Sequence, residues 1–122
     1  MLNKETTIRE EKKLDANVGE HIGYELGAKM IKNYCDKNKE VGAHFIGRNI
    51  IEKILSQPEC IGIKIFKAVD ENDQQTYVFT GVDTEGKVIL ELTAITPHGE
   101  LKTSEGIVAD RVRREGWFND II

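Results

Sequence analysis

Residues 43–69, AHFIGRNIIEKILSQPECIGIKIFKAV, contain the change of hydrophobic period that decides the fold. Over Ala43–Ser56 the apolar residues recur at spacings of three and four, which predicts an amphipathic helix. Pro58 ends this helix, because proline lacks the backbone donor that a further turn needs. Over Cys60–Val69 isoleucines first alternate with other residues, which predicts a β-strand. A helix joined directly to a strand indicates an α+β domain.

Further segments downstream predict strands that follow one another through short turns. The strands are expected at Thr76–Val82 and Val88–Ile95, with a short fourth strand near Leu101–Thr103. Residues 70–73 and 83–86 are rich in Asp, Asn and Gly, which tolerate tight backbone turns. Because short connections join neighbouring antiparallel strands, we expect a three- to four-stranded antiparallel β-meander.

A second helical pattern lies upstream, over Glu20–Lys37, where apolar residues again share one face. Gly19, Gly23 and Gly27 are spaced by four residues before and within this pattern. Either the helix begins after Gly23 or Gly27, or these small residues form a groove that another backbone approaches closely. The expected fold is therefore α+β, with two or three N-terminal helices packed on the meander.

The length and composition of the chain describe one domain. It has 122 residues, of which 39% are hydrophobic and 31% charged, a mixture that excludes a disordered or collagen-like chain. Residues 1–19 are rich in charges of both signs, and we expect a partly ordered segment there, followed by a single domain over 20–122. The formal net charge of −4 argues against binding to nucleic acid through broad phosphate contact.

Several absences bear on compartment and cofactors. The chain has no run of about 20 apolar residues, so no contact with a membrane interior is expected. Charged residues follow Met1 closely, without the apolar region of a secretory signal, which favours a cytoplasmic protein with Cys35 and Cys60 as thiols. The phosphate- and dinucleotide-binding motifs GxxxxGK[ST] and GxGxxG do not occur, so we expect no cofactor.

The candidates for catalysis are Cys60, as a nucleophile, and His44, as its base. His44 lies near the start of the expected helix and Cys60 just beyond its end, which separates them by about 20 Å at 1.5 Å per residue. The two are therefore not expected to meet within one chain. A small thiol-dependent enzyme or redox protein centred on Cys60, with His44 or His98 from a neighbouring chain, is the alternative hypothesis.

Charged clusters suggest weaker sites. His21 and Glu25 are four residues apart and would share a helix face, where they could hold a metal ion, but a lone His–Glu pair does not define a site and we expect no metal. Arg111, Arg113 and Arg114 could clamp a carboxylate or phosphate, or they could lie paired on a solvated face.

The C-terminal end of the chain is unusually apolar, and its large side chains are Trp117, Phe118, Ile121 and Ile122. These residues either pack on the chain's own core or on a partner, since exposed apolar patches of that size mark interfaces. Together with Gly23 and Gly27 they form the candidate interface. The favoured hypothesis is a non-enzymatic protein-interaction or small-ligand-binding domain, which forms a homodimer or binds another protein.

Residues 43–65, with their helix, their Gln-Pro-x-Cys break over Gln57–Cys60 and their apolar strand, resemble small uncharacterised proteins of Bacteroidetes-type bacteria. The turn at Gly81–Asp83 is similar to a turn in the same proteins, and the likeness covers the middle half of the chain. Some of those proteins end in a cysteine- and proline-rich segment, whereas residues 114–118 here read REGWF, so no role is carried over from that segment. The resemblance implies a bacterial, cytoplasmic protein with an α+β fold, and it implies no activity.

Overall fold

The computed structural model describes residues 14–38 and 42–115, which form two helices and seven strands. The helices are α2 (Tyr24–Lys37) and α3 (Arg48–Leu55). The strands form three small antiparallel sheets: β1 (Ala43–Phe45) with β7 (Arg113–Glu115), β2 (Gly62–Val69) with β3 (Gln75–Val82) and β6 (Val108–Ala109), and β4 (Glu91–Ile95) with β5 (Leu101–Glu105). This arrangement confirms the α+β class, but a single three- to four-stranded meander does not form.

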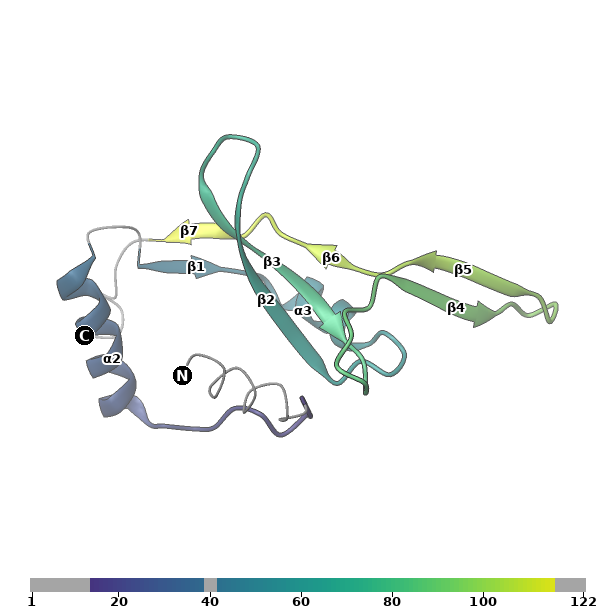
Figure 1. Ribbon diagram of the computed structural model, residues 1–122, viewed down its shortest axis with the longest axis horizontal. Helices are drawn as coiled ribbons and strands as arrows, with labels where there is room; N and C mark the ends of the chain where they lie inside the picture. Colours follow the sequence, from purple (N-terminus) through teal and green to yellow (C-terminus); the bar gives the residue numbers. More distant parts are fainter. Residues whose placement is uncertain (1–13, 39–41, 116–122) are drawn as a thin grey trace, which may run out of the picture.

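The core lies where α3 packs on the sheet of strand order β2-β3-β6 (Figure 1). Ile54 on α3, Phe79 on β3 and Ala109 on β6 are buried together, and Ile54 is 0% exposed. Half-buried side chains surround these three, namely Ile46, Ile50, Cys60, Ile63, Tyr77, Ile107 and Val112. The apolar face that predicts the helix is thus the face that the sheet covers.

The helix predicted for Ala43–Ser56 is too long at its N-terminal end. Residues Ala43–Phe45 form β1, which pairs antiparallel with β7. Gly47 then precedes α3 in an extended conformation, with φ −76° and ψ 160°. The cause is tertiary, because pairing with Arg113–Glu115 supplies backbone hydrogen bonds that a local helical pattern cannot reveal.

The strand predicted for Val88–Ile95 begins beside β3, as in a meander. Val88 forms a bridge with Val82, and the Ile89 N–H donates to the carbonyl of Gly81 over 2.9 Å. The predicted turn at residues 83–86 is therefore a genuine hairpin turn, in which the Gly86 N–H donates to the Asp83 carbonyl.

The same strand then leaves β3 at Leu90. The next two positions on β3, Thr80 and Phe79, pair with β6 instead, so the place of the continuing strand is taken. The strand beside β3 therefore consists of two antiparallel pieces, residues 88–89 and β6, and residues 90–107 leave the sheet between them. We call residues 90–107 the arm. This excursion is the reason why no continuous meander forms.

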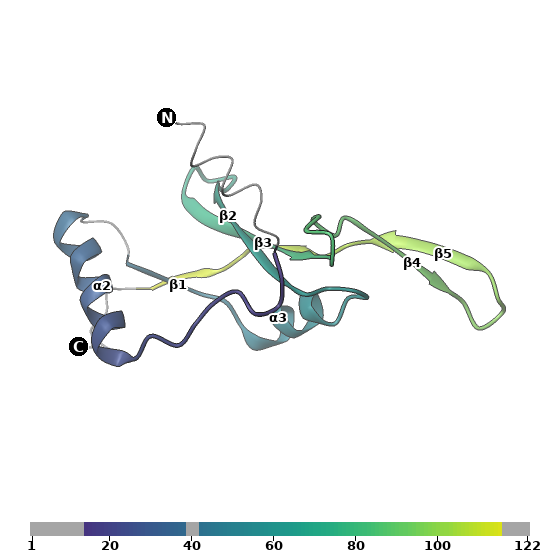
Figure 2. The same ribbon diagram turned by 60° about the horizontal axis from the view of Figure 1, so that its bottom comes forward.

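The arm is a two-stranded hairpin that stands apart from the core. Its strands β4 and β5 pair from Glu91 opposite Glu105 at the base to Ile95 opposite Leu101 near the tip. In both ribbon views it projects outward, and no other described element lies along β4 or β5 beyond the base (Figures 1 and 2).

At the opposite end of the molecule, α2 lies beyond the β1–β7 ribbon (Figure 1). None of the residues of α2 is buried. The helix begins at Tyr24, directly after Gly23, whose φ of 88° is left-handed. The helix therefore begins after Gly23, as the first of the two alternatives states, and Gly27 lies within it.

Candidate interaction surface

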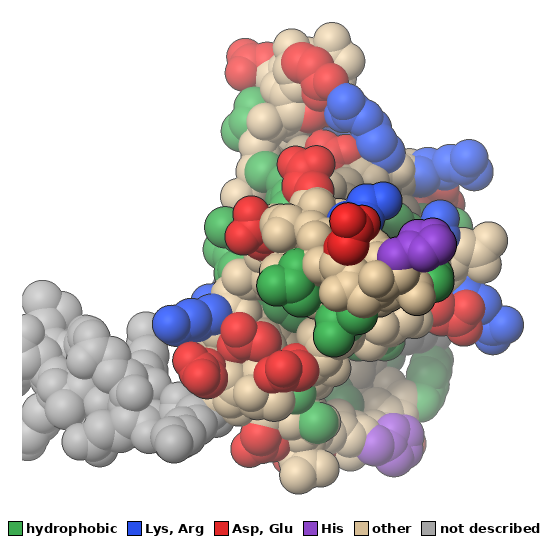
Figure 3. Space-filling model, turned by 90° about the vertical axis from the view of Figure 1, so that its right-hand side faces the viewer, with side chains coloured by type: hydrophobic (Ala, Val, Ile, Leu, Met, Phe, Trp, Pro, Cys, Tyr) green, Lys and Arg blue, Asp and Glu red, His purple; other side chains and the backbone are tan. Residues whose placement is uncertain are grey.

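The arm exposes large apolar side chains to solvent. Leu90 is 63% exposed, Ile95 72% and Leu101 75%, although Ile95 and Leu101 lie opposite each other across the hairpin. Seen from the side on which the arm projects, apolar side chains reach the surface between acidic and basic ones (Figure 3). An isolated two-stranded sheet is marginally stable in water, and exposed apolar groups gain from burial. The arm is therefore the leading candidate for an interaction surface.

One face of the arm carries a regular pattern from base to tip. Glu91 lies opposite Glu105, and two threonines, Thr93 and Thr103, form the next pair on the same face. The pair Ile95–Leu101 completes that face near the tip. Like charges directly opposite each other destabilise a hairpin, so the two carboxylates at the base favour the approach of a cation.

The base of the arm is fixed by Gln57, a buried residue that follows α3 and is 6% exposed. Its Nε2 donates to the Ile54 carbonyl over 3.0 Å, and its Oε1 accepts the Ile107 N–H over 2.8 Å. This amide therefore ties the end of α3 to the end of the arm. A Cβ at Gly81 would lie 2.7 Å from the Gln57 Nε2, so only glycine leaves room for the side chain.

Gly106 closes the other side of the base. Its N–H donates to the Leu90 carbonyl over 2.9 Å, where the two ends of the arm meet. A Cβ at Gly106 would lie 2.3 Å from the carbonyl oxygen of Ile89, so only a glycine allows this approach. The arm thus has a rigid base and a free outer part.

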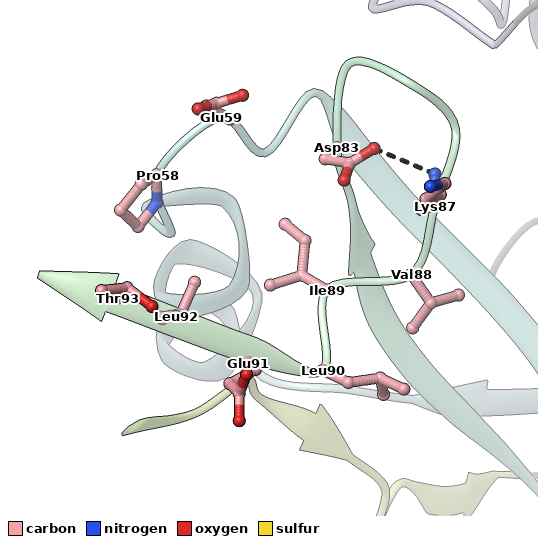
Figure 4. A pocket seen from close by; sticks show the side chains of 10 residues that line it. All are labelled: Pro58, Glu59, Asp83, Lys87, Val88, Ile89, Leu90, Glu91, Leu92 and Thr93. Atoms are coloured by element: carbon pink, nitrogen blue, oxygen red, sulfur yellow. Dashed lines mark hydrogen bonds between the residues drawn. The ribbon is translucent and has the colours of Figure 1, made fainter. Parts of the chain in front are cut away.

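A hollow of about 410 Å³ lies at the base between β4, the turn after β3 and the loop after α3 (Figure 4). Ile89 points into it between Pro58 and Asp83, and Leu92 borders it from β4. Asp83 is engaged in its own turn, where its Oδ1 accepts the N–H groups of Glu85 and Lys87. The lining is mixed: Pro58, Ile89 and Leu92 are apolar, whereas Glu59, Asp83, Lys87 and Glu91 are charged, and it contains neither cysteine nor histidine.

The candidate pair of Cys60 and His44 does not meet in one chain. The half-buried Cys60 thiol donates to the Gly62 carbonyl over 3.3 Å and lies against Gly81. The His44 ring in β1 packs edge-on against Tyr77 with 4.8 Å between ring centroids. Gly81 and Tyr77 are four residues apart on β3, about 13 Å at the rise of a strand. Each side chain is thus engaged at a different place on the core.

The other predicted site residues are placed separately. His21 lies before α2 and Glu25 lies in its first turn, so the two do not share a helical face. Within residues 14–38 and 42–115 no group of three His, Cys, Asp or Glu side chains could hold a metal ion. At Gly27 an added Cβ would meet only the Ile22 Cδ1, at 3.9 Å. The apolar candidates of the C-terminal end lie outside the described residues: Trp117, Phe118, Ile121 and Ile122.

Two of the three arginines near the C-terminal end, Arg111 and Arg114, form side-chain hydrogen bonds within the chain. Arg111 donates through Nη1 and Nη2 to both carboxylate oxygens of Glu71, in the turn between β2 and β3. These hydrogen bonds, with the positive charge of Arg111, lower the pKa of Glu71 from 4.5 to about 2. Arg114 donates to the Gln74 side chain over 3.0 Å. Arg111, between β6 and β7, and Arg114, in β7, thus fasten the β2–β3 turn to this part of the chain.

Sequence reasoning did not single out the arm. Its strands read as ordinary members of a sheet, and only Gly106 marks the place where the chain returns under Ile89. The outer edge of β2 was likewise not identified, since Lys64 and Lys67 look like ordinary exposed residues.

The comparisons with known proteins add no identity. Among the described residues, no helix is both long and apolar enough to cross a bilayer. No protein-family model, no curated protein and no solved structure matches the chain.

Proposed function

We propose that this chain is a non-enzymatic protein-interaction domain that associates with other copies of itself through the arm. The observation that carries this proposal is the hairpin of β4 and β5, which pairs only with itself among the described strands. Its apolar residues Leu90, Ile95 and Leu101 gain little from the fold of one chain, because all three are more than 60% exposed. Burying such a side chain is worth about 1.5–3 kcal/mol, which favours association.

The surroundings of the arm support the same proposal. Its base is held by Gln57 and Gly106, so the outer part is presented in a fixed direction. Rigid presentation reduces the entropy lost on binding. The small core that α3 and three strands provide adds a second reason, because association would stabilise a marginal domain by mass action.

The test is to remove the arm without disturbing the core. Because the Gly106 N–H donates to the Leu90 carbonyl, residues 91–105 can be replaced by Asn-Gly, which forms a tight two-residue turn. We expect the intact chain to form dimers whose fraction rises with concentration, and the shortened chain to be a folded monomer, in light scattering coupled to size exclusion. An intact chain that stays monomeric at all concentrations would overturn the proposal.

The thiol-dependent enzyme centred on Cys60 stays the alternative. It would require a base from a second chain, since Cys60 and His44 lie at different places on the core. Alkylation of Cys60 as a function of pH decides between the two readings. A thiol that reacts as an ordinary cysteine, with a pKa of about 8.5, leaves the enzyme hypothesis without support. Bacterial origin and a cytoplasmic location stay predictions.

A further inference from the structure

We propose that the arm of one copy adds, through β4, as an antiparallel strand to the outer edge of β2 in a second copy. This inference rests on the proposed function and names the surface that receives the arm. β4 pairs with β5 on one side only, and β2 pairs with β3 on one side only, among the described strands. Pairing of two such edges from different chains is known as β-strand addition.

The outer edge of β2 is long and open. β2 pairs over eight residues with β3, and within residues 14–38 and 42–115 no strand pairs with its other side. Two apolar residues on it, Ile65 and Val69, are 59% and 65% exposed. A hollow of about 360 Å³ lies beside the first half of β2, and its other border is formed by Leu14 and Val18, in the segment before α2. An unpaired edge of this length is a template for another strand.

The side chains on the core face of β2 complement one face of β4. On β2 that face carries Ile63, Ile65 and Lys67, because they pair with core-facing positions of β3. On β4 it carries an acid, a threonine and an isoleucine in turn, at positions 91, 93 and 95. Antiparallel pairing with Glu91 opposite Lys67 sets Thr93 opposite Ile65 and Ile95 opposite Ile63. Glu91 is then opposite a residue of opposite charge, Lys67, and Ile95 is opposite Ile63. Both are favourable cross-strand pairs.

The opposite face fits in the same register. Leu92 lies opposite Phe66, and both are partly exposed in the single chain. Ala94 lies opposite Lys64, whose ammonium already sits 5.9 Å from the Phe66 ring centroid and need not move. The small alanine leaves that cation–π contact in place.

Other registers pair the same strands less well. A shift by two residues sets Glu91 opposite Ile65 in one direction or Val69 in the other, which leaves a carboxylate beside an apolar side chain. Pairing of β4 with β4 of the second copy, centred on Thr93, sets Glu91 opposite Ile95. The Glu91–Lys67 register also brings a cation to the pair of carboxylates at the base of the arm, which no described cation contacts through a salt bridge.

A twofold axis would repeat the contact. Each copy then donates one arm and receives one, so the assembly closes as a dimer and leaves no free site. Charge reversal at a single position therefore acts on both contacts of the dimer at once.

The closing experiment is charge reversal with rescue. We expect Glu91→Lys and Lys67→Glu each to raise the dimer dissociation constant about tenfold, because two like-charge pairs replace two attractive ones. The double variant, with both reversals in one chain, should return to within about threefold of the original constant. Two controls carry the same changes elsewhere: Glu100→Lys at the tip of the arm and Lys29→Glu on the exposed helix α2, and both should stay close to the original chain.

A disulfide reports the register directly. In chains whose own cysteines are replaced by alanine, Ile65→Cys in one chain and Thr93→Cys in another should cross-link on oxidation when mixed. Neither chain should cross-link alone, whereas cross-linking of the Thr93→Cys chain with itself would show arm-to-arm pairing and overturn the inference. A dimer that depends on the arm but ignores both charge reversals overturns the inference and leaves the proposed function standing. A chain that is always monomeric removes the proposed function itself.

Discussion

The Gly106 α-carbon lies so close to the Ile89 backbone that a Cβ on it would be 2.3 Å from the Ile89 carbonyl oxygen. The added Cβ would clash with backbone atoms, and its own position is fixed by the Gly106 backbone, so no change of side-chain rotamer could relieve the clash. The chain leaves the core at Ile89 and returns at Gly106, and the direction of the arm is set by this crossing.

We therefore expect Gly106→Ala to destabilise the protein by about 1–3 kcal/mol, the usual range for overpacking a close contact. Urea denaturation followed by circular dichroism measures the loss. Gly62→Ala is the matched control. Gly62 also lies beside a paired strand, opposite Val82, but an added Cβ there would have no atom within 4 Å. If the two variants unfold at the same urea concentration, the crossing is looser than described.

Removing the amide of Gln57 should also loosen the base of the arm. Gln57→Ala leaves the partly buried Ile107 N–H without its acceptor, which costs about 1–3 kcal/mol. Hydrogen exchange at the Ile107 amide should accelerate in step with the loss of stability. The exposed Gln75, which makes one long hydrogen bond of 3.5 Å to Tyr77, is the control, and Gln75→Ala should change stability by no more than about 0.5 kcal/mol.

Ile54 should be the most sensitive position of the core. It is 0% exposed, and Ile54→Ala is expected to cost about 2–5 kcal/mol because it opens a cavity against Phe79 and Ala109. The neighbouring Leu55 is 45% exposed on the same helix, so Leu55→Ala should cost much less. Chemical denaturation of both variants, at a concentration below that of dimer formation, checks the difference.

The ion pair of Glu71 and Arg111 predicts how stability depends on pH. Because the pKa of Glu71 is about 2 in the folded chain and 4.5 when unperturbed, the unfolded state binds the proton first as the pH falls. The contribution of Glu71 is therefore complete above pH 4.5 and is lost progressively between pH 4.5 and about 2. Both side chains are well exposed, at 70% and 64%, so added salt should weaken the effect.

Glu71→Gln should accordingly flatten the fall of the melting temperature in that acidic range. Thermal unfolding at a series of pH values measures the slope, and carboxyl chemical shifts of Glu71 report its pKa directly. Glu100→Gln, at the exposed tip of the arm, is the control and should follow the original chain. Equal slopes for the original chain and Glu71→Gln would show that the ion pair does not persist in solution.

Local patterns in the sequence predict much of the fold but not its assembly. The alternation around Ile63 and the β-branched and aromatic residues around Phe79 predict β2 and β3, and Pro58 marks the end of the preceding helix correctly. These features depend on neighbours along the chain, where period and turn chemistry act. The predicted start of α3 is wrong because β1 pairs with residues about seventy positions away, and no local pattern contains that contact.

The candidate site was less accessible from sequence for the same reason. The segment Val88–Ile95 has one continuous strand pattern, and whether it stays on β3 is decided by competition with Val108 and Ala109. Sequence reasoning therefore placed the surplus apolar surface at the C-terminal end, whereas the structure adds a second surplus on the arm, at Ile95 and Leu101.

The two-piece strand beside β3 makes the arm modular. Ile89 and Val108 occupy consecutive places along β3, so residues 91–105 can change in number without moving a core residue, provided that the hairpin keeps its pairing and Leu90 and Gly106 stay in place. Insertion or deletion of two residues in each strand near the tip would alter the reach of the arm while keeping Glu91 and Ile95 on the same face. A domain of this kind can acquire new binding preferences by remodelling the arm alone, with stability and recognition encoded in separate parts of one short chain.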